Sequence, residues 1–348
     1  MEDTINYQKN LENCIFVKTI LMMLVIVYHS MVFWGGGDWF NVKSVAIECN
    51  VLKYLALWLN SFLIYGFVFI SGYLFEYLKR EKNKYQKFFA FIVNKSKRLL
   101  IPYIFVAIVW VIPISSIWNL YTTNEIFTKF ILCVGPSQLW FLWMLFDVFI
   151  IIWLIYKWTK SDLGAIIISI LSWGIGIIGG KLFLNIFCIW TAFTYLPYFI
   201  LGMKIRENKT FCLYKILKYF FVIIQIFLFI LWQIIGHKEA FIFKLLSIVF
   251  QYSTYIFGAL MSFFVLQWLA EKVNWRNNEL FMTLAKRSMT IYLFHQQIIY
   301  FTISCFNGKI NPYLNVIVNF IVAIFFSSLI SKFLMNFKCT RVLIGEKN

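Results

Sequence analysis

The chain has 348 residues, of which 61% are hydrophobic, 21% are aromatic and only 14% are charged, and its mean hydropathy is +0.78. A soluble domain contains about 25% charged residues, so this composition excludes a soluble globular protein and indicates a polytopic membrane protein. The formal net charge of +17 is better explained by membrane orientation than by nucleic-acid binding, as the loops below indicate.

Recurring apolar runs predict an all-α bundle of about ten membrane-spanning helices in a single domain, residues 1–348. The first run is too long for a cleavable signal peptide, and no A-x-A-like site follows it, so we expect an uncleaved first span. The predicted spans are 14–34, 51–77, 99–118, 138–157, 163–180, 182–203, 214–236, 242–269, 289–306 and 312–335.

Lysine and arginine gather in alternate loops. The basic segments are 79–98, 204–218, 272–287 and the tail 338–347, whereas the loops between them are much poorer in both residues. Basic loops remain on the cytoplasmic side of a membrane. The pattern therefore predicts ten spans with both termini in the cytoplasm.

Cysteine and histidine usage gives no indication of a metal. The seven cysteines are scattered without a C-x-x-C pair, which predicts neither a zinc site nor a disulfide framework. Only three histidines are present, and His237 falls in a predicted outer loop, which disfavours a three-histidine site. We expect no bound metal and no resident cofactor. The cysteines are Cys14, Cys49, Cys133, Cys188, Cys212, Cys305 and Cys339.

A histidine lies inside the first apolar run, in the stretch LVIVYHSMVFW, 24–34. Lys18 precedes His29 by eleven residues, so the two share one helix face and lie about 16 Å apart along the axis. His29 is either a buried, hydrogen-bonded residue or a general base that takes a proton from a hydroxyl nucleophile. Lys18 either orients the span from the interface or lines the same cavity as His29.

Two further pairs of polar residues and one isolated acid lie at or within the predicted spans. Lys95 and Arg98 share a face where the basic loop enters the third span, and they either orient it or bind an anionic group. Tyr292 and His295 lie on one face of the ninth span, where they bind a ligand or hydrogen-bond neighbouring helices. Asp147, near the middle of the fourth span, is a functional candidate or one half of an ion pair.

These residues stand in stretches that resemble the acyltransferase-3 family of integral membrane O-acyltransferases. Two positions depart from the family, because Lys18 and Lys95 stand where many relatives have arginine. Lysine keeps the positive charge but lacks the fork geometry with which arginine binds phosphate. We see no fused extracytoplasmic hydrolase-like domain and expect a stand-alone membrane core. The stretches are Lys18 with VYHS (27–30), FVFISGYLF (67–75), KSKRLLIPY (95–103), QLWFLWMLF (138–146), and YLPYFILG (195–202) with SMTIYLFH (288–295).

The resemblance implies a function and roles for residues. His29 would be catalytic, and Lys95 and Arg98, with Lys18, would bind the phosphates of an acyl-CoA donor. Ser71, Tyr292, His295 and Asp147 are candidate lining residues. The expected reaction is O-acylation of a surface glycan or lipid-linked sugar, most simply O-acetylation from acetyl-CoA. The expected location is the bacterial cytoplasmic membrane, where membrane lipid surrounds the chain. No nucleic-acid partner is expected.

The expected position of His29 beyond the membrane midplane requires a donor arm that reaches deep into the bundle or a covalent relay. Two other functions remain open: an exporter or flippase of polysaccharide or lipid-linked sugar, and a structural partner in a glycan-assembly complex.

Overall fold

The computed structural model describes residues 2–35, 49–208 and 214–346, and in these ranges the chain is helical with no β-strand. This confirms the predicted all-α polytopic class. Parts of the predicted cytoplasmic loops (209–213 and 347–348), together with Cys212, lie outside the described residues. The first helices are α1 (Glu2–Met31), α2 (Asn50–Asn60), α3 (Leu63–Glu76), α4 (Phe88–Val106), α5 (Ile112–Ile117), α6 (Thr123–Ile126) and α7 (Trp140–Ile155). They are followed by α8 (Asp162–Leu182), α9 (Ile189–Glu207), α10 (Tyr214–Ile235), α11 (Phe241–Lys272), α12 (Glu279–Phe306), α13 (Pro312–Leu334) and α14 (Lys338–Leu343).

Nine helical segments of the described chain are long and apolar enough to cross a membrane, and they overlap nine of the ten predicted spans. The remaining predicted span, 289–306, falls within α12, a helix of 28 residues. Its hydropathy is lowered by the consecutive polar residues His295, Gln296 and Gln297, all of them buried. A helix enclosed by other helices carries polar groups that a lipid-facing helix does not tolerate.

Two predicted boundaries differ from the structure. The run predicted as 51–77 is broken at Ser61 and Phe62 into α2 and α3, with the Ser61 hydroxyl donating to the carbonyl of Trp58 and accepting from Gln225. The third span begins at Phe88 rather than near residue 99, because the basic stretch before it is already helical. Hydropathy alone does not detect either feature, since a polar turn can be buried and a basic segment can be helical.

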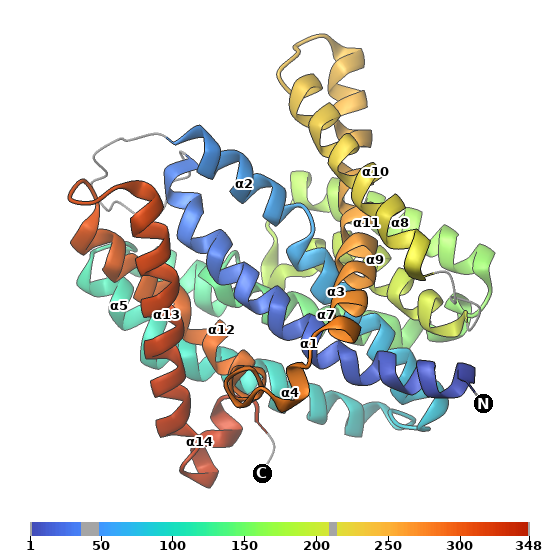
Figure 1. Cartoon of the computed structure of the whole chain (residues 1–348), viewed down its shortest axis with the longest axis horizontal. Helices are drawn as coiled ribbons and strands as arrows, with labels where there is room; N and C mark the ends of the chain where they lie inside the picture. Colours follow the sequence, from blue (N-terminus) through green and yellow to red (C-terminus); the bar gives the residue numbers. More distant parts are fainter. Residues whose placement is uncertain (1, 36–48, 209–213, 347–348) are drawn as a thin grey trace.

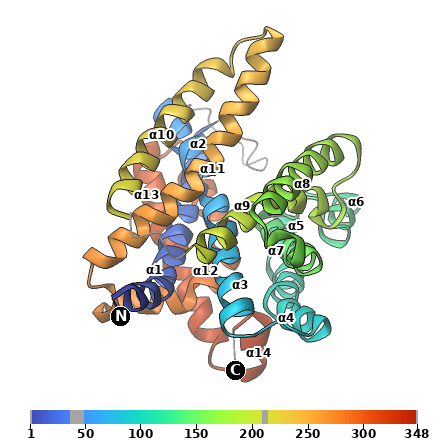
Figure 2. The ribbon, with the colours of Figure 1, turned by 90° about the vertical axis from the view of Figure 1, so that its right-hand side faces the viewer.

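Helix α1 lies at the centre of the bundle, where it contacts α2, α3, α11, α12 and α13 (Figure 1). Helices α10 and α11 form an antiparallel pair that extends beyond the rest of the molecule in both views (Figure 1, Figure 2). Helices α7, α8 and α9 pack together on the other side of α3 (Figure 2). Because α1 contacts helices from both halves of the chain, its residues are enclosed by other helices.

Helices α3 and α9 cross with their backbones in contact. A Cβ added at Gly72 would lie 2.0 Å from the carbonyl oxygen of Phe199, and one added at Gly202 would lie 2.0 Å from that of Phe69. Small residues at such a crossing let membrane helices approach closely. In the last turn of α9, the buried Arg206 donates two hydrogen bonds to Glu81, at 2.9 and 3.0 Å, and one to Tyr73 at 3.0 Å.

We expect Gly72→Ala to destabilise the bundle, because the added methyl group has no space without separating α3 from α9. Overpacking of this kind costs about 1–3 kcal/mol. The unfolding temperature of the purified protein in detergent measures the effect. Gly174→Ala in α8 is the matched control, since nothing lies within 4 Å of its added Cβ. Equal unfolding temperatures for the two variants would contradict the close-crossing argument.

Candidate functional site

The two histidines predicted from separate spans are joined by a hydrogen bond. Nδ1 of His29 in α1 lies 2.7 Å from Nε2 of His295 in α12. Nδ1 of His295 lies 2.7 Å from the backbone carbonyl oxygen of Tyr292. A carbonyl oxygen can only accept, so His295 carries its proton on Nδ1 and uses Nε2 as an acceptor. The Nδ1–H of His29 then donates to His295, which makes Nε2 the basic nitrogen of His29.

The segment before α7 holds α12 in position beside the histidines. The side-chain amide of Gln138 donates to the carbonyl of Leu293 at 3.0 Å and to Oε1 of Gln297 at 2.8 Å. In return, the hydroxyl of Tyr292 donates to the backbone carbonyl of Gln138. Partners of this kind fix the orientation of a functional side chain. His295, fully buried, is thus oriented by its own helix, which the segment before α7 holds in place.

A cavity of about 270 Å³ contains the predicted cationic residues. Lys18 of α1 and Lys95 and Arg98 of α4 all line it. Their positive charges are near enough to repel one another. None of the three forms an ion pair with a carboxylate of the described residues. The three cations therefore give this cavity a positively charged wall. The other lining residues include Ser71, Ser288, Tyr292, Phe141, Phe149 and Glu346.

Lys95 is buried in an aromatic environment. Its Nζ lies 3.4 Å from the ring centroid of Phe149, 4.9 Å from that of Tyr85 and 5.6 Å from that of Phe91. Aromatic faces stabilise an ammonium group that has lost much of its water. This environment explains how a lysine with only 8% of its surface exposed can be accommodated beside Arg98.

The single acidic side chain among the described lining residues of this cavity is Glu346, which follows α14. Burial raises the pKa of its carboxyl group, and the Arg98 guanidinium lowers it to a smaller extent. A raised pKa means that the folded protein disfavours the ionised carboxylate at this position. Glu346 is therefore a poor counter-ion for the three cations.

A second, smaller cavity of about 120 Å³ adjoins the first and is lined by His29. Val25, Ile64, Phe141 and Tyr292 line both cavities. Apart from the aliphatic Leu63, the remaining lining residues carry amide or aromatic groups, which can bind sugars by hydrogen bonding and stacking. They are Tyr28, Asn60, Gln138 and Trp140.

The two cavities lie toward opposite ends of the bundle. On α1, Lys18 lines the larger cavity and Tyr28 the smaller one, ten residues and about 15 Å further along the helix axis. On α3, which runs the other way, Leu63 lines the smaller cavity and Leu78, just beyond the helix, lines the larger one. His29 is thus located where a cavity lined by three cations meets a cavity with polar and aromatic walls.

Of the residues predicted for the site, His295 and Asp147 line neither cavity, although His295 is hydrogen-bonded to His29, which lines the smaller one. Oδ2 of Asp147 is buried without a hydrogen-bond partner among the described residues. No three His, Cys, Asp or Glu side chains in the described part of the chain are grouped as metal ligands. Lys18, Lys95, Arg98, Ser71 and Tyr292 share the larger cavity.

Sequence reasoning did not identify Gln138, Asn60 and Glu346 as site residues. Both Gln138 and Asn60 had one available signal, because Gln138 is an uncharged polar residue at the start of an apolar run and Asn60 is one inside a run. Glu346 had none, since it lies eleven residues beyond the last predicted span. Its place in the cavity depends on α14 folding back onto α4.

The fold and the two cavities define a polytopic membrane protein with a histidine pair at an internal junction. A family model described as the acyltransferase domain of the acyltransferase-3 family matches residues 13–335. The chain therefore belongs to this family, as its motifs indicated, and is a multi-pass membrane acyltransferase. No curated protein and no solved structure matches it.

Proposed function

We propose that this acyltransferase moves a short acyl group, most simply acetyl, from acyl-CoA to a hydroxyl group of a surface glycan or lipid-linked sugar at the bacterial cytoplasmic membrane. The observation that carries the proposal is the position of His29 at the junction of the two cavities. One cavity offers unpaired cations to an anionic donor, and the other offers amide and aromatic groups to a sugar.

The donor enters the larger cavity from the side of the basic loops. Lys18, Lys95 and Arg98 bind the phosphates of acyl-CoA, and the apolar walls accept the pantetheine arm. This cavity extends from Arg98 to Tyr292, which itself lines the cavity of His29. Because the two cavities share wall residues, we favour a donor arm that passes between these side chains and reaches the histidine directly over a covalent relay.

The transfer step uses His29 as general base and then as general acid. Nε2 of His29 takes the proton of the acceptor hydroxyl while its oxygen attacks the thioester carbonyl carbon. The tetrahedral intermediate collapses, its carbon–sulfur bond breaks, and the CoA sulfur receives the proton back from Nε2. The products are the acylated sugar and the free thiol of CoA. His295 positions His29 by accepting the hydrogen bond from its Nδ1–H.

Release of the CoA thiol tests this function. Purified protein in nanodiscs is supplied with acetyl-CoA, with and without surface glycan stripped of its ester groups, and free thiol is followed over time. We expect thiol release to be stimulated by the glycan and to match the amount of ester formed on it. The heat-inactivated protein gives the background rate. Absence of release with acetyl-CoA and with longer acyl-CoA donors would contradict the proposal and favour the exporter hypothesis.

A further inference from the structure

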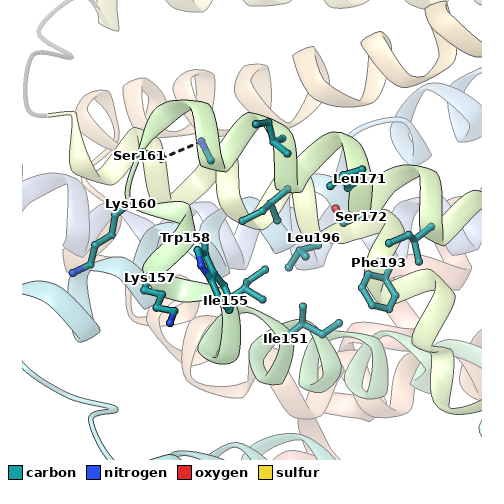
Figure 3. A pocket seen from close by; sticks show the side chains of 14 residues that line it. Ile151, Ile155, Lys157, Trp158, Lys160, Ser161, Leu171, Ser172, Phe193 and Leu196 are labelled. Carbon is teal, nitrogen blue, oxygen red and sulfur yellow. Dashed lines mark hydrogen bonds between the residues drawn. The ribbon is translucent and has the colours of Figure 1, made fainter.

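A second cavity system lies on the outer face of the bundle, away from the histidines. It is a groove of about 670 Å³ between the last turns of α7, the length of α8 and the first half of α9. Figure 3 shows Lys157, Lys160, Trp158 and Ser161 gathered at one end, and Phe193 and Leu171 toward the other. None of these residues lines the cavities of the candidate site.

The floor and walls of the groove are almost wholly apolar. Ile151 and Ile155 come from α7, Phe193 and Leu196 come from α9, and the rest of the wall is formed by α8. On α8, the lining residues run from Gly164 to Ile175, eleven residues further along, or about 16 Å of the roughly 30 Å hydrocarbon core. Exposed apolar surface on a membrane-spanning helix is covered by lipid chains. The remaining apolar lining residues of α8 are Ile167, Ile168 and Leu171.

The end of the groove near residue 160 carries positive charge. Lys157 and Lys160 belong to η6 (Tyr156–Thr159) and the residue after it, and both are exposed. Neither forms an ion pair with a carboxylate of the described residues. Asp162, two residues beyond Lys160, is paired with Lys204 at 3.2 Å, and Lys204 also binds Glu207 at 2.8 Å. Nζ of Lys157 lies 4.6 Å from the ring centroid of Trp158, and Nζ of Lys160 lies 5.8 Å from that of Tyr156, and these contacts leave both positive charges uncompensated. Two cations therefore remain available to an anionic group.

The local backbone fixes the shape of this end. The hydroxyl of Ser161 accepts a hydrogen bond from the backbone N–H of Gly164 at 3.1 Å, which caps the first turn of α8 (Figure 3). A Cβ at Gly164 would lie 2.2 Å from the carbonyl oxygen of Trp158, so only glycine allows this close turn. The turn holds the exposed indole of Trp158 beside the apolar wall. Tryptophan is enriched at membrane–water interfaces, so this position fits the end of a membrane span.

We propose that this groove binds one anionic glycerophospholipid of the bilayer, with its acyl chains along α8 and its phosphate at Lys157 and Lys160. Charge complementarity supports this occupant, because basic pockets between membrane helices on the cytoplasmic side bind anionic head groups. The site is separate from the acyl-transfer cavities, and the proposal does not depend on the proposed function.

Native mass spectrometry of the delipidated full chain, titrated with phosphatidylglycerol or with phosphatidylcholine of identical acyl chains, tests the proposal. We expect the wild type to retain one phosphatidylglycerol in preference to phosphatidylcholine. Loss of both charges in K157Q/K160Q should lower the affinity for phosphatidylglycerol by roughly 30-fold, since each lysine near the surface contributes about fivefold. The matched control K272Q/K286Q removes two exposed lysines from other basic segments and should bind as the wild type does.

A second pair of variants tests the apolar part of the site. Ile167→Trp fills the groove and should lower the binding of both lipids, whereas Ile166→Trp, on an exposed neighbour that does not line the groove, should not. Equal phosphatidylglycerol binding by the wild type and K157Q/K160Q would overturn the proposal. Displacement of the bound lipid by an equimolar polyprenyl phosphate, or a lipid-free dimer as the dominant species, would also overturn it, by assigning the groove to another occupant.

Discussion

Replacement of His29 by alanine should lower the turnover number for acyl transfer by about 10²–10⁴-fold, the contribution of a positioned general base. The carbonyl of Tyr292 orients His295, and His295 in turn fixes the tautomer of His29, so the basic nitrogen is defined by the fold. Initial rates of thiol release at saturating donor and acceptor give the measurement. His237→Ala, at an exposed position outside both cavities, is the matched control and should leave the rate unchanged.

His295 has a different role, because it acts through His29 and is a positioning residue. His295→Ala should lower the turnover number less than His29→Ala does, and should alter the pH–rate profile by releasing the tautomer of His29. His295→Gln, which offers a side-chain oxygen as acceptor, should recover part of the rate. A purely structural role for His295 would lower the yield of folded protein without changing the shape of that profile. For the first prediction, full activity of His29→Ala would remove His29 from the mechanism.

Lys95→Met should raise the KM for acetyl-CoA by about 10–100-fold and leave the KM for the glycan unchanged. Hydrogen bonds to charged groups contribute about 1.5–3 kcal/mol, and a buried ammonium beside Arg98 and Lys18 is positioned to make them to phosphate. Methionine retains the apolar stem against the ring of Phe149, so the change isolates the charge. Steady-state kinetics with each substrate varied in turn provide the two constants.

The control for this variant is Lys97→Met, two residues further along α4, where the side chain is exposed and does not line the cavity. Acetyl-pantetheine, a donor without the CoA phosphates, gives an independent check, because the wild type and Lys95→Met should use it equally well. A defect of Lys95→Met with acetyl-pantetheine as large as the one with acetyl-CoA, or larger, would contradict the phosphate-binding role of Lys95.

The sequence allowed prediction of the fold class, because the bilayer imposes long apolar helices that hydropathy detects directly. It also singled out His29, His295 and Lys18 as candidates, since ionisable residues within apolar runs are rare and conspicuous, and Lys95 with Arg98 as a basic pair at the entrance of the third span. The same reasoning did not predict that the two histidines are hydrogen-bonded to each other, because 266 residues separate them in the chain. Contacts between helices depend on packing, which periodicity does not encode.

Asp147 illustrates the opposite outcome. Its isolation in an apolar span made it a candidate, yet it lines neither cavity. The α7 face turned toward the larger cavity is the one that carries Phe141, Leu145 and Phe149. Gln138, on the same segment, was overlooked as uncharged although it binds α12. An uncharged amide is a weak signal in a sequence and a strong constraint in a low-dielectric interior.

The four side chains shared by the two cavities also separate them, which has a consequence for the energised membrane. Val25, Ile64, Phe141 and Tyr292 lie where the larger cavity meets the smaller one. A continuous water column there would conduct ions, and each charge that crosses releases about 2.3 kcal/mol per 100 mV. Apolar side chains at the junction oppose such a column, because they offer water no hydrogen bonds. The same side chains that would admit an acyl group therefore also act as electrical insulation.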